Sequence, residues 1–157
     1  MVEISIDYEG ELGVVIGRRT HRATRQEAAA SVLGLCCGND VTARDLQKTD
    51  GQWTRAKGFD TFCPMGPRVV AGLDWRALEV ICRVNGAVRQ HGHARDMMYG
   101  IPRLVSYVSG IMTLEPGDVI ATGTPEGVGP LVPGDLVEVE IPGIGLLANP
   151  VTGKVTP

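Results

Sequence analysis

Hydrophobic and polar residues alternate along the beginning of the chain. Ile4, Ile6 and Tyr8 fall on one side of an extended segment, with polar residues between them. A nearly continuous apolar run over residues 12–16 follows. Because the side chains of a strand point alternately to its two faces, this pattern predicts one strand over residues 4–16 that runs into the core.

Two later segments carry helical signals. Thr24 and Glu27 match a capping box, in which the threonine caps the helix and the glutamate returns a hydrogen bond three residues on. We therefore expect a helix over residues 28–35. Residues 101–112 repeat apolar side chains at every third or fourth position, which predicts an amphipathic helix.

Strand and turn signals dominate the remainder of the chain. Residues 78–84 alternate and are followed by Asn85-Gly86, a dipeptide that favours a tight hairpin because both positions accept positive φ. Apolar strands are expected at residues 119–122 and 136–141, each after a Pro-Gly-Asp turn. No linker divides these segments, so we expect a single domain over residues 1–157.

Composition and charge narrow the classes of function. The 21 glycines and 10 prolines suit short strands joined by turns better than a helical bundle. The net charge of −3 leaves no broad basic surface for nucleic acid. No apolar run approaches the ~20 residues of a membrane span, and no signal peptide opens the sequence. We expect neither nucleic acid nor membrane as a partner.

Cysteine usage bears on the compartment and on covalent chemistry. The four cysteines form no C-x-x-C pair, and they are Cys36, Cys37, Cys63 and Cys82. We interpret all four as small buried apolar residues of a protein in the reducing cytoplasm, with neither a disulfide framework nor a zinc site. No serine or cysteine stands in a nucleophile-elbow context, so acyl-enzyme chemistry has no support.

An acidic pair beside the first apolar run is a candidate metal site. Glu9 and Glu11 are two residues apart, so both carboxylates project from one face of a strand. Like charges next to a core repel one another and resist desolvation unless a cation neutralises them, and Mg²⁺ and Ca²⁺ prefer oxygen ligands. The alternative is an edge strand with a solvated acidic face, which Asp7 on the same face favours.

A second polar group follows the first predicted helix. If residues 39–47 are helical, Asp40, Arg44 and Gln47 share one face and offer a carboxylate, a guanidinium and an amide. The alternative is a surface ion pair, which contributes at most about 1 kcal/mol.

Two further segments have weaker signals. Residues 122–129 combine hydroxyls and glycines after a buried strand and could present backbone N–H groups to an anion, although a plain connecting loop is the commoner case. His91 and His93 could pair on a metal ion, but their charged surroundings favour a solvated surface. His21 lies in a basic stretch and indicates little.

Taken in chain order, these segments resemble the C-terminal catalytic domain of the fumarylacetoacetate hydrolase family. The similarity extends over roughly residues 4–150. The motifs that carry it are Tyr8–Leu12, Asn39–Gln47, Lys57–Phe62, Pro64–Pro67, Val84–Gly86, Arg89–Gln90, Leu114–Ile120 and Thr122–Pro125. The resemblance implies a mainly β fold, a mixed β-sheet roll with a few short helices, and a homodimer.

The resemblance also implies a divalent cation, usually Mg²⁺ and sometimes Mn²⁺ or Ca²⁺. By this resemblance, the metal-binding carboxylates match Glu9, Glu11 and Asp40. The substrate-binding positions match Arg44, Gln47, Lys57 and Thr124. Lys57 and Gln47 are the expected catalytic residues. A lysine beside a cation is expected to have a lowered pKa and to transfer protons, while the metal acts as a Lewis acid on an enolate.

Family members act on small 2-oxo and diketo acids, often in the catabolism of aromatic compounds. The resemblance first implies C–C hydrolysis of an acylpyruvate or fumarylpyruvate. The alternatives are isomerisation of 2-hydroxyhepta-2,4-diene-1,7-dioate, decarboxylation of a 2-oxo acid, or a metal-binding fragment without activity. This last alternative arises because the family usually carries a preceding lid segment with a histidine and a glutamate, which the sequence from Met1 does not match. We therefore expect an N-terminally truncated chain.

Overall fold

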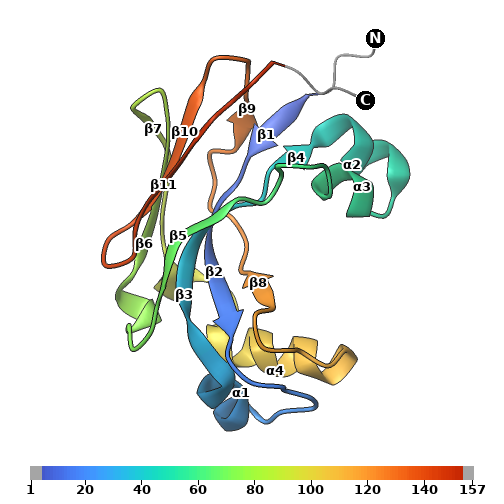
Figure 1. Cartoon of the computed structure of the whole chain (residues 1–157), viewed down its shortest axis with the longest axis vertical. Coiled ribbons are helices and arrows are strands. Elements are labelled where there is room, and N and C mark those ends of the chain that lie inside the picture. Colours follow the sequence, from blue (N-terminus) through green and yellow to red (C-terminus); the bar gives the residue numbers. More distant parts are fainter. Residues whose placement is uncertain (1–4, 154–157) are drawn as a thin grey trace.

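The computed structural model describes residues 5–153 and confirms a mainly β domain with a few short helices (Figure 1). The first half contains β1 (Ile6–Tyr8), β2 (Gly10–Ile16), α1 (Arg25–Ser31), β3 (Val32–Asn39), β4 (Thr42–Ala43), α2 (Arg44–Asp50), α3 (Thr54–Lys57) and β5 (Met65–Val70). The second half contains η1 (Trp75–Ala77), β6 (Glu79–Val84), β7 (Ala87–His93), η2 (Ala94–Asp96), α4 (Ile101–Ile111), β8 (Val119–Ala121), β9 (Gly129–Pro130), β10 (Leu136–Ile141) and β11 (Gly145–Pro150).

The described strands form three sheets, and every pairing between them is antiparallel. Two four-stranded sheets have the orders β5-β3-β2-β8 and β11-β10-β6-β7, and a small third sheet has the order β4-β1-β9. The main apolar core includes buried residues of β2 and β3 together with those of β6 and β10. The first two sheets therefore enclose the core and support the segments between them.

The first strand is divided, which corrects the expectation of a single strand over residues 4–16. β1 belongs to the small sheet and β2 to a large one, and Glu9 lies between them. β2 begins at Gly10, where two segments of the chain pass closely, because a Cβ at this position would lie 2.9 Å from the Cβ of Cys82. β2 is flanked by β3 and β8 and is buried throughout, so the alternative of a solvated edge strand is wrong.

The first helix is also shorter than expected. The capping box at Thr24 and Glu27 is present, but the helix ends at Ser31 and residues 32–39 form β3. Close packing on β5 explains the change, because a Cβ at Gly34 would lie 2.7 Å from the carbonyl oxygen of Val70. Tertiary pairing thus overrides the helical signal of residues 32–35.

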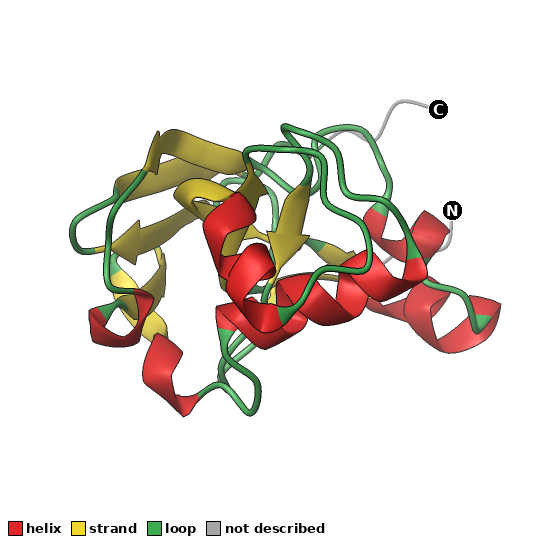
Figure 2. Ribbon diagram, turned by 90° about the horizontal axis from the view of Figure 1, so that it is seen from below, coloured by secondary structure: helices red, strands yellow, loops and turns green. Residues whose placement is uncertain are grey.

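Other local predictions are confirmed. The hairpin turn forms at Asn85 and Gly86, whose φ values are 53° and 78°. β10 covers residues 136–141, and α4 ends one residue before the predicted limit. Helices α1 and α4 lie side by side at one end of the molecule (Figure 1). In the view from that end, helices lie in front of the strands (Figure 2).

The cysteines follow the sequence interpretation in three of four cases. Cys36, Cys37 and Cys82 are buried, whereas Cys63 is exposed in the turn before β5. Its φ of 54° shows that this turn holds the chain in the left-handed region, which carries the side chain outward instead of into the core. Among residues 5–153, no helix combines the length and apolar character needed to cross a bilayer.

Candidate metal and substrate site

The three carboxylates singled out in the sequence converge. Oxygen atoms of Glu9, Glu11 and Asp40 lie within 4.8 Å of one another. The break between β1 and β2 fixes this arrangement, because the Glu9 N–H donates to Oδ1 of Asn39 (2.8 Å) and the Asp40 N–H donates to the Glu9 carbonyl (2.9 Å). Glu9 is 7% exposed and Glu11 is 3% exposed, so both acids are buried.

Asp40 reaches this cluster from outside a helix, contrary to the expectation of one helical face. Helix α2 starts at Arg44, after the short strand β4 has paired with β1. Arg44 and Gln47 are still adjacent, since Nη1 of Arg44 donates to Oε1 of Gln47 at 2.9 Å. The segment thus supplies Asp40 from a loop and the other two side chains from the first turn of α2.

Lys57, at the end of α3, places its ammonium against the carboxylates. Its Nζ donates to Oε2 of Glu9 (3.1 Å), to Oδ2 of Asp40 and to the hydroxyl of Thr42 (3.1 Å). Burial alone would lower the pKa of Lys57, but the hydrogen bonds to Asp40 and Glu9 outweigh it and raise that pKa. This direction is opposite to the lowered pKa expected from the sequence, because two anions surround the ammonium.

Arg44 is held by several acceptors. Its Nε donates to Oδ2 of Asp7 at 2.8 Å, and its Nη2 lies 2.6 Å from Oε1 of Glu9. With the bond to Gln47, three of its five N–H groups are engaged. Arg44 therefore orients Glu9 and retains two N–H groups for a ligand.

Glu11 is the most strongly perturbed acid of the cluster. Its pKa is raised to about 7, chiefly by burial and then by the charges of Asp40 and Glu9, although a hydrogen bond from the Gly123 N–H at 2.8 Å acts in the opposite direction. Gly123 has a φ of 100°, a backbone conformation that favours glycine. The loop at residues 122–126 is thereby attached directly to the acidic cluster.

Thr124 belongs to a buried network that holds the same loop. Its hydroxyl donates to the Gly10 carbonyl (2.9 Å) and accepts from Nε2 of Gln90 (2.8 Å). Gln90 is 1% exposed, and it also accepts from the Gly10 N–H and donates to the Pro125 carbonyl. Gln90 was expected only as part of a family motif, but its burial on β7 and its hydrogen bond to Thr124 show that it positions this residue.

A divalent cation suits this set of donors. Glu9, Glu11 and Asp40 are three hard oxygen ligands, and the pKa of Glu11 is raised first by burial and then by the negative charges of Asp40 and Glu9, both of which a bound cation would offset. Lys57 and Arg44 contribute two positive charges and contact different oxygens of Glu9, but neither forms an ion pair with Glu11. The residues present thus fit a cation such as Mg²⁺ or Mn²⁺.

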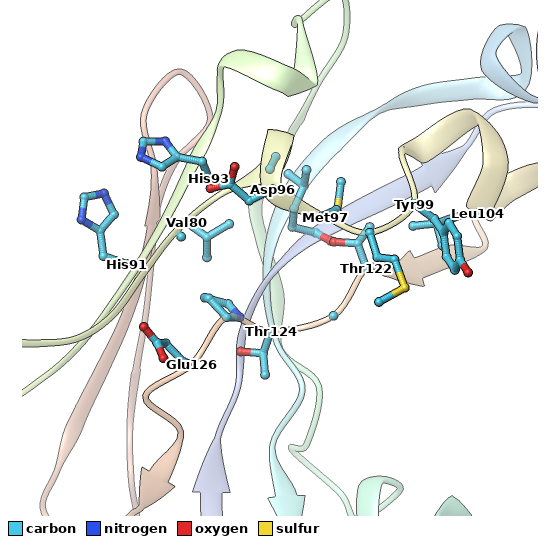
Figure 3. A pocket seen from close by; sticks show the side chains of 16 residues that line it. Val80, His91, His93, Asp96, Met97, Tyr99, Leu104, Thr122, Thr124 and Glu126 are labelled. Carbon is cyan, nitrogen blue, oxygen red and sulfur yellow. The ribbon is translucent and has the colours of Figure 1, made fainter.

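A cavity of about 460 Å³ lies beside the same loop (Figure 3). Its lining comes from residues 122–126, the end of β7, and residues 96–99 before α4. Leu12, Val80 and Leu104 add apolar surface. Because Gly123 lines this cavity and also binds Glu11, the loop connects an acidic site to a partly apolar space.

The three histidines lie away from the acidic cluster. Nδ1 of His21 is 3.3 Å from the hydroxyl of Thr113. His91 and His93 lie on β7, where both are at least partly exposed, as the surface interpretation predicted. Glu79 lies between these two rings, a neighbour that the sequence analysis did not identify.

Comparisons with known proteins identify relatives along nearly the whole chain. Oxaloacetate tautomerase YisK of Bacillus subtilis is 46% identical, covering 94% of this chain and 52% of its own length. The crystal structure of 5-carboxymethyl-2-hydroxymuconate delta-isomerase from Mycobacterium smegmatis has a TM-score of 0.94 at 51% identity, covering 97% of this chain and 61% of that one. Fumarylacetoacetate hydrolase from Exiguobacterium antarcticum has a TM-score of 0.91 at 45% identity, covering 96% and 57%.

The matched portion of these relatives is part of a longer chain. This chain spans between 58% and 61% of the length of three curated relatives that are 51–54% identical to it. The family profile of the fumarylacetoacetate (FAA) hydrolase C-terminal domain matches residues 2–152. Together with the three sheets and the fold of the solved relatives, this match shows that the chain belongs to the fumarylacetoacetate hydrolase family, through its C-terminal domain.

Proposed function

We propose that this domain catalyses metal-dependent proton transfer on a small 2-oxo dicarboxylic acid, as a keto–enol tautomerase or isomerase. The observation that carries the proposal is the Lys57 ammonium, which contacts two of the three clustered carboxylates. Two of the relatives described above are named for reactions of this kind, a tautomerase and a delta-isomerase. Such a reaction moves one proton from carbon to oxygen and neither adds nor removes other atoms.

Glu9, Glu11 and Asp40 are the residues that would hold the cation. When bound, a divalent cation supplies Lewis-acid stabilisation of negative charge on a 2-oxo acid. Mg²⁺ is the cation we propose first, with Mn²⁺ or Ca²⁺ as alternatives, because all three ligands are carboxylates.

We assign the proton-donating group to the ammonium of Lys57. Its three N–H donors are all engaged, by Glu9, Asp40 and Thr42, so a substrate oxygen must replace one of these acceptors. The Nζ of Lys57 would donate a proton to the developing enolate oxygen, while the proton that leaves carbon passes to solvent, from which Nζ is protonated again.

The other predicted residues bind or position the substrate. Arg44 keeps two N–H groups for a substrate carboxylate, and Gln47 fixes the orientation of its guanidinium. Thr124 is held by Gln90 at the edge of the cavity, where a second polar group of the substrate would lie. We include Gln47 as a positioning residue because its side chain contacts Arg44.

Hydrolysis of an acylpyruvate or fumarylpyruvate is the second candidate. It is supported by the similarity to the Exiguobacterium hydrolase. Tautomerisation and hydrolysis share an enolate but differ in whether water cleaves a C–C bond. The third possibility, decarboxylation, would release CO₂ from the keto form of the substrate and leave an enolate that is one carbon shorter.

One set of assays separates these reactions. The whole chain is incubated with oxaloacetate and with an acylpyruvate, in Mg²⁺ or in EDTA, and followed by NMR in D₂O. We expect Mg²⁺-dependent exchange at C3 of oxaloacetate that exceeds the protein-free rate and is lost in Asp40→Asn, but not in the control Glu138→Gln on the outer face of β10. Cleavage of the acylpyruvate without exchange would establish hydrolysis instead. Inactivity in both assays, with Mg²⁺ bound, would favour the inactive metal-binding fragment.

We also propose that the chain forms a homodimer. Helix α4 buries Ile101 and Val105 but exposes Tyr107 and Ile111, which are 70% and 64% exposed. Apolar surface of this kind favours association, and two-fold dimers are the commonest closed assembly. Light scattering should give twice the mass of one chain, and Tyr107→Glu should reduce it toward the monomer. A monomeric parent protein would contradict the proposal.

A further inference from the structure

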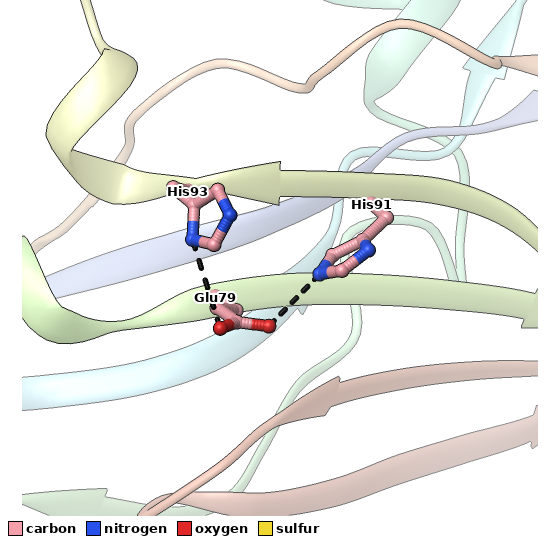
Figure 4. Close-up of side chains that lie close together, drawn as sticks. All are labelled: Glu79, His91 and His93. Atoms are coloured by element: carbon pink, nitrogen blue, oxygen red, sulfur yellow. Dashed lines mark hydrogen bonds and ion pairs between the residues drawn. The ribbon is translucent and has the colours of Figure 1, made fainter.

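The hairpin β6–β7 brings three metal-binding side chains together on its outer face. Glu79 lies directly opposite His93 in the ladder, and Ile81 lies opposite His91. The inner face of the same strands carries the buried Val80 and Gln90. Because alternate residues of a strand share a face, both histidines and the glutamate project to the same side, as Figure 4 shows.

The distances within this cluster suit a common ion. Nε2 of His91 lies 2.8 Å from Oε2 of Glu79, and Nδ1 of His93 lies 3.7 Å from Oε1 of the same carboxylate. One ligand atom from each residue falls within 4.8 Å of the others. Ligands about 2.0–2.1 Å from a tetrahedral zinc ion are about 3.3 Å apart. Small rotations of the rings would therefore bring all three atoms to one centre.

The donor set differs in kind from the carboxylate cluster at Glu9. Imidazole nitrogen suits Zn²⁺, Ni²⁺ and Cu²⁺, whereas Mg²⁺ and Ca²⁺ prefer oxygen alone. Two histidines and one carboxylate are also the protein ligands of several zinc sites that keep an open position. The two clusters should consequently select different cations.

Exposure leaves this cluster open to an ion. The side chains of Glu79, His91 and His93 are 38%, 51% and 34% exposed, so solvent reaches each of them. The carboxylate of Glu79 and both imidazoles are therefore accessible as ligands.

We propose that Glu79, His91 and His93 form a second metal site, which binds a borderline divalent cation such as Zn²⁺ or Co²⁺ and leaves at least one coordination position open. The site joins the first residue of β6 to the last residue of β7. Both histidines also line the cavity beside residues 122–126, so the ion would lie at the rim of that cavity.

Cobalt absorption provides a direct test that is independent of enzyme activity. The whole chain, carrying Glu11→Gln and kept in excess Mg²⁺ to suppress binding at the carboxylate cluster, is titrated with Co²⁺ at pH 7.5. We expect visible d–d bands that saturate at one equivalent, and loss of these bands when Zn²⁺ is added. Loss of a residue that only supports a ligand costs about 10- to 100-fold in metal affinity. His91→Gln and His93→Gln should each weaken binding at least that much.

A matched control uses the third histidine. His21→Gln removes an imidazole that contacts Thr113 and lies outside the cluster, so it should leave Co²⁺ affinity unchanged. Binding that survives His91→Gln and His93→Gln, or that is lost in His21→Gln, would overturn the proposal. A parent protein that shows no such bands would overturn it as well. Circular dichroism confirms that each variant is folded.

Discussion

Replacing Glu11 by glutamine should stabilise the protein when no cation is available and abolish the benefit of adding one. Glu11 is 3% exposed and its pKa is raised to about 7, chiefly by burial and then by Asp40 and Glu9. An amide has nearly the same shape, carries no charge and can still accept the hydrogen bond of Gly123. The substitution thus removes a buried negative charge and keeps the packing.

The magnitude follows from the pKa of Glu11. Because this pKa is about 7 in the folded chain and 4.5 as a reference, the folded state binds the proton more tightly. The contribution of Glu11 to the free energy of unfolding is therefore fully present below pH 4.5 and is lost as the pH rises to about 7. At ~1.4 kcal/mol for each pH unit, the loss amounts to about 3 kcal/mol. Allowing for the new amide protons, we expect Glu11→Gln to recover about 1–3 kcal/mol at pH 8.

Urea unfolding monitored by circular dichroism at pH 5 and pH 8 tests this reasoning. In EDTA the variant should exceed the parent at pH 8 and approach it at pH 5. Mg²⁺ at about 100 times its Kd should stabilise the parent by about 2.7 kcal/mol and leave the variant unchanged, which removes most or all of the advantage of the variant. Glu138→Gln is the control and should show neither effect. A variant that is less stable than the parent at pH 8 in EDTA would refute the argument.

Three further predictions concern the residues around the site. Lys57→Met should lower kcat and kcat/KM together by about 100-fold or more in steady-state assays, because a donor to the enolate is lost; a rise in KM alone would make Lys57 a substrate anchor. Gln90→Leu should lower the free energy of unfolding by about 2–4 kcal/mol in urea titrations, since one buried and two half-buried partners lose their hydrogen bonds; a change below about 1 kcal/mol would contradict this. Cys63 should react with a thiol reagent in the folded protein, because it is exposed. Cys37 and Cys82 should react only after unfolding, since burial raises their pKa values to about 11 and about 12; equal reaction rates for all three would disprove this.

Local signals were sufficient where the structure depends on a few neighbouring residues. The turn at Asn85-Gly86 and the helix from Ile101 were predictable because their cause lies in adjacent side chains. The end of α1 was not, since Ser31 is followed by a segment whose strand conformation depends on β5, far away in the sequence. The division at Glu9 likewise requires two separate sheets to meet.

The candidate site shows the same limit. The resemblance supplied Glu9, Glu11 and Asp40 together, but the face-sharing argument for Asp40 failed because α2 starts later. Glu79 was missed for a subtler reason. The register of β6–β7 shifts between Cys82 and Arg83. A regular hairpin from the same turn would place Glu79 opposite a glycine and on the other face from the histidines, so only the bulge joins them.

The attachment of Glu11 to Gly123 affects how the protein should fold. These two residues are 112 positions apart in the chain, and Asp40 and Lys57 come from still other segments. No short fragment holds the complete arrangement, so cation affinity develops only after distant parts of the chain have met. A bound cation should therefore leave the early steps of folding unchanged and mainly slow unfolding. Metal occupancy would thus set the lifetime of the native state.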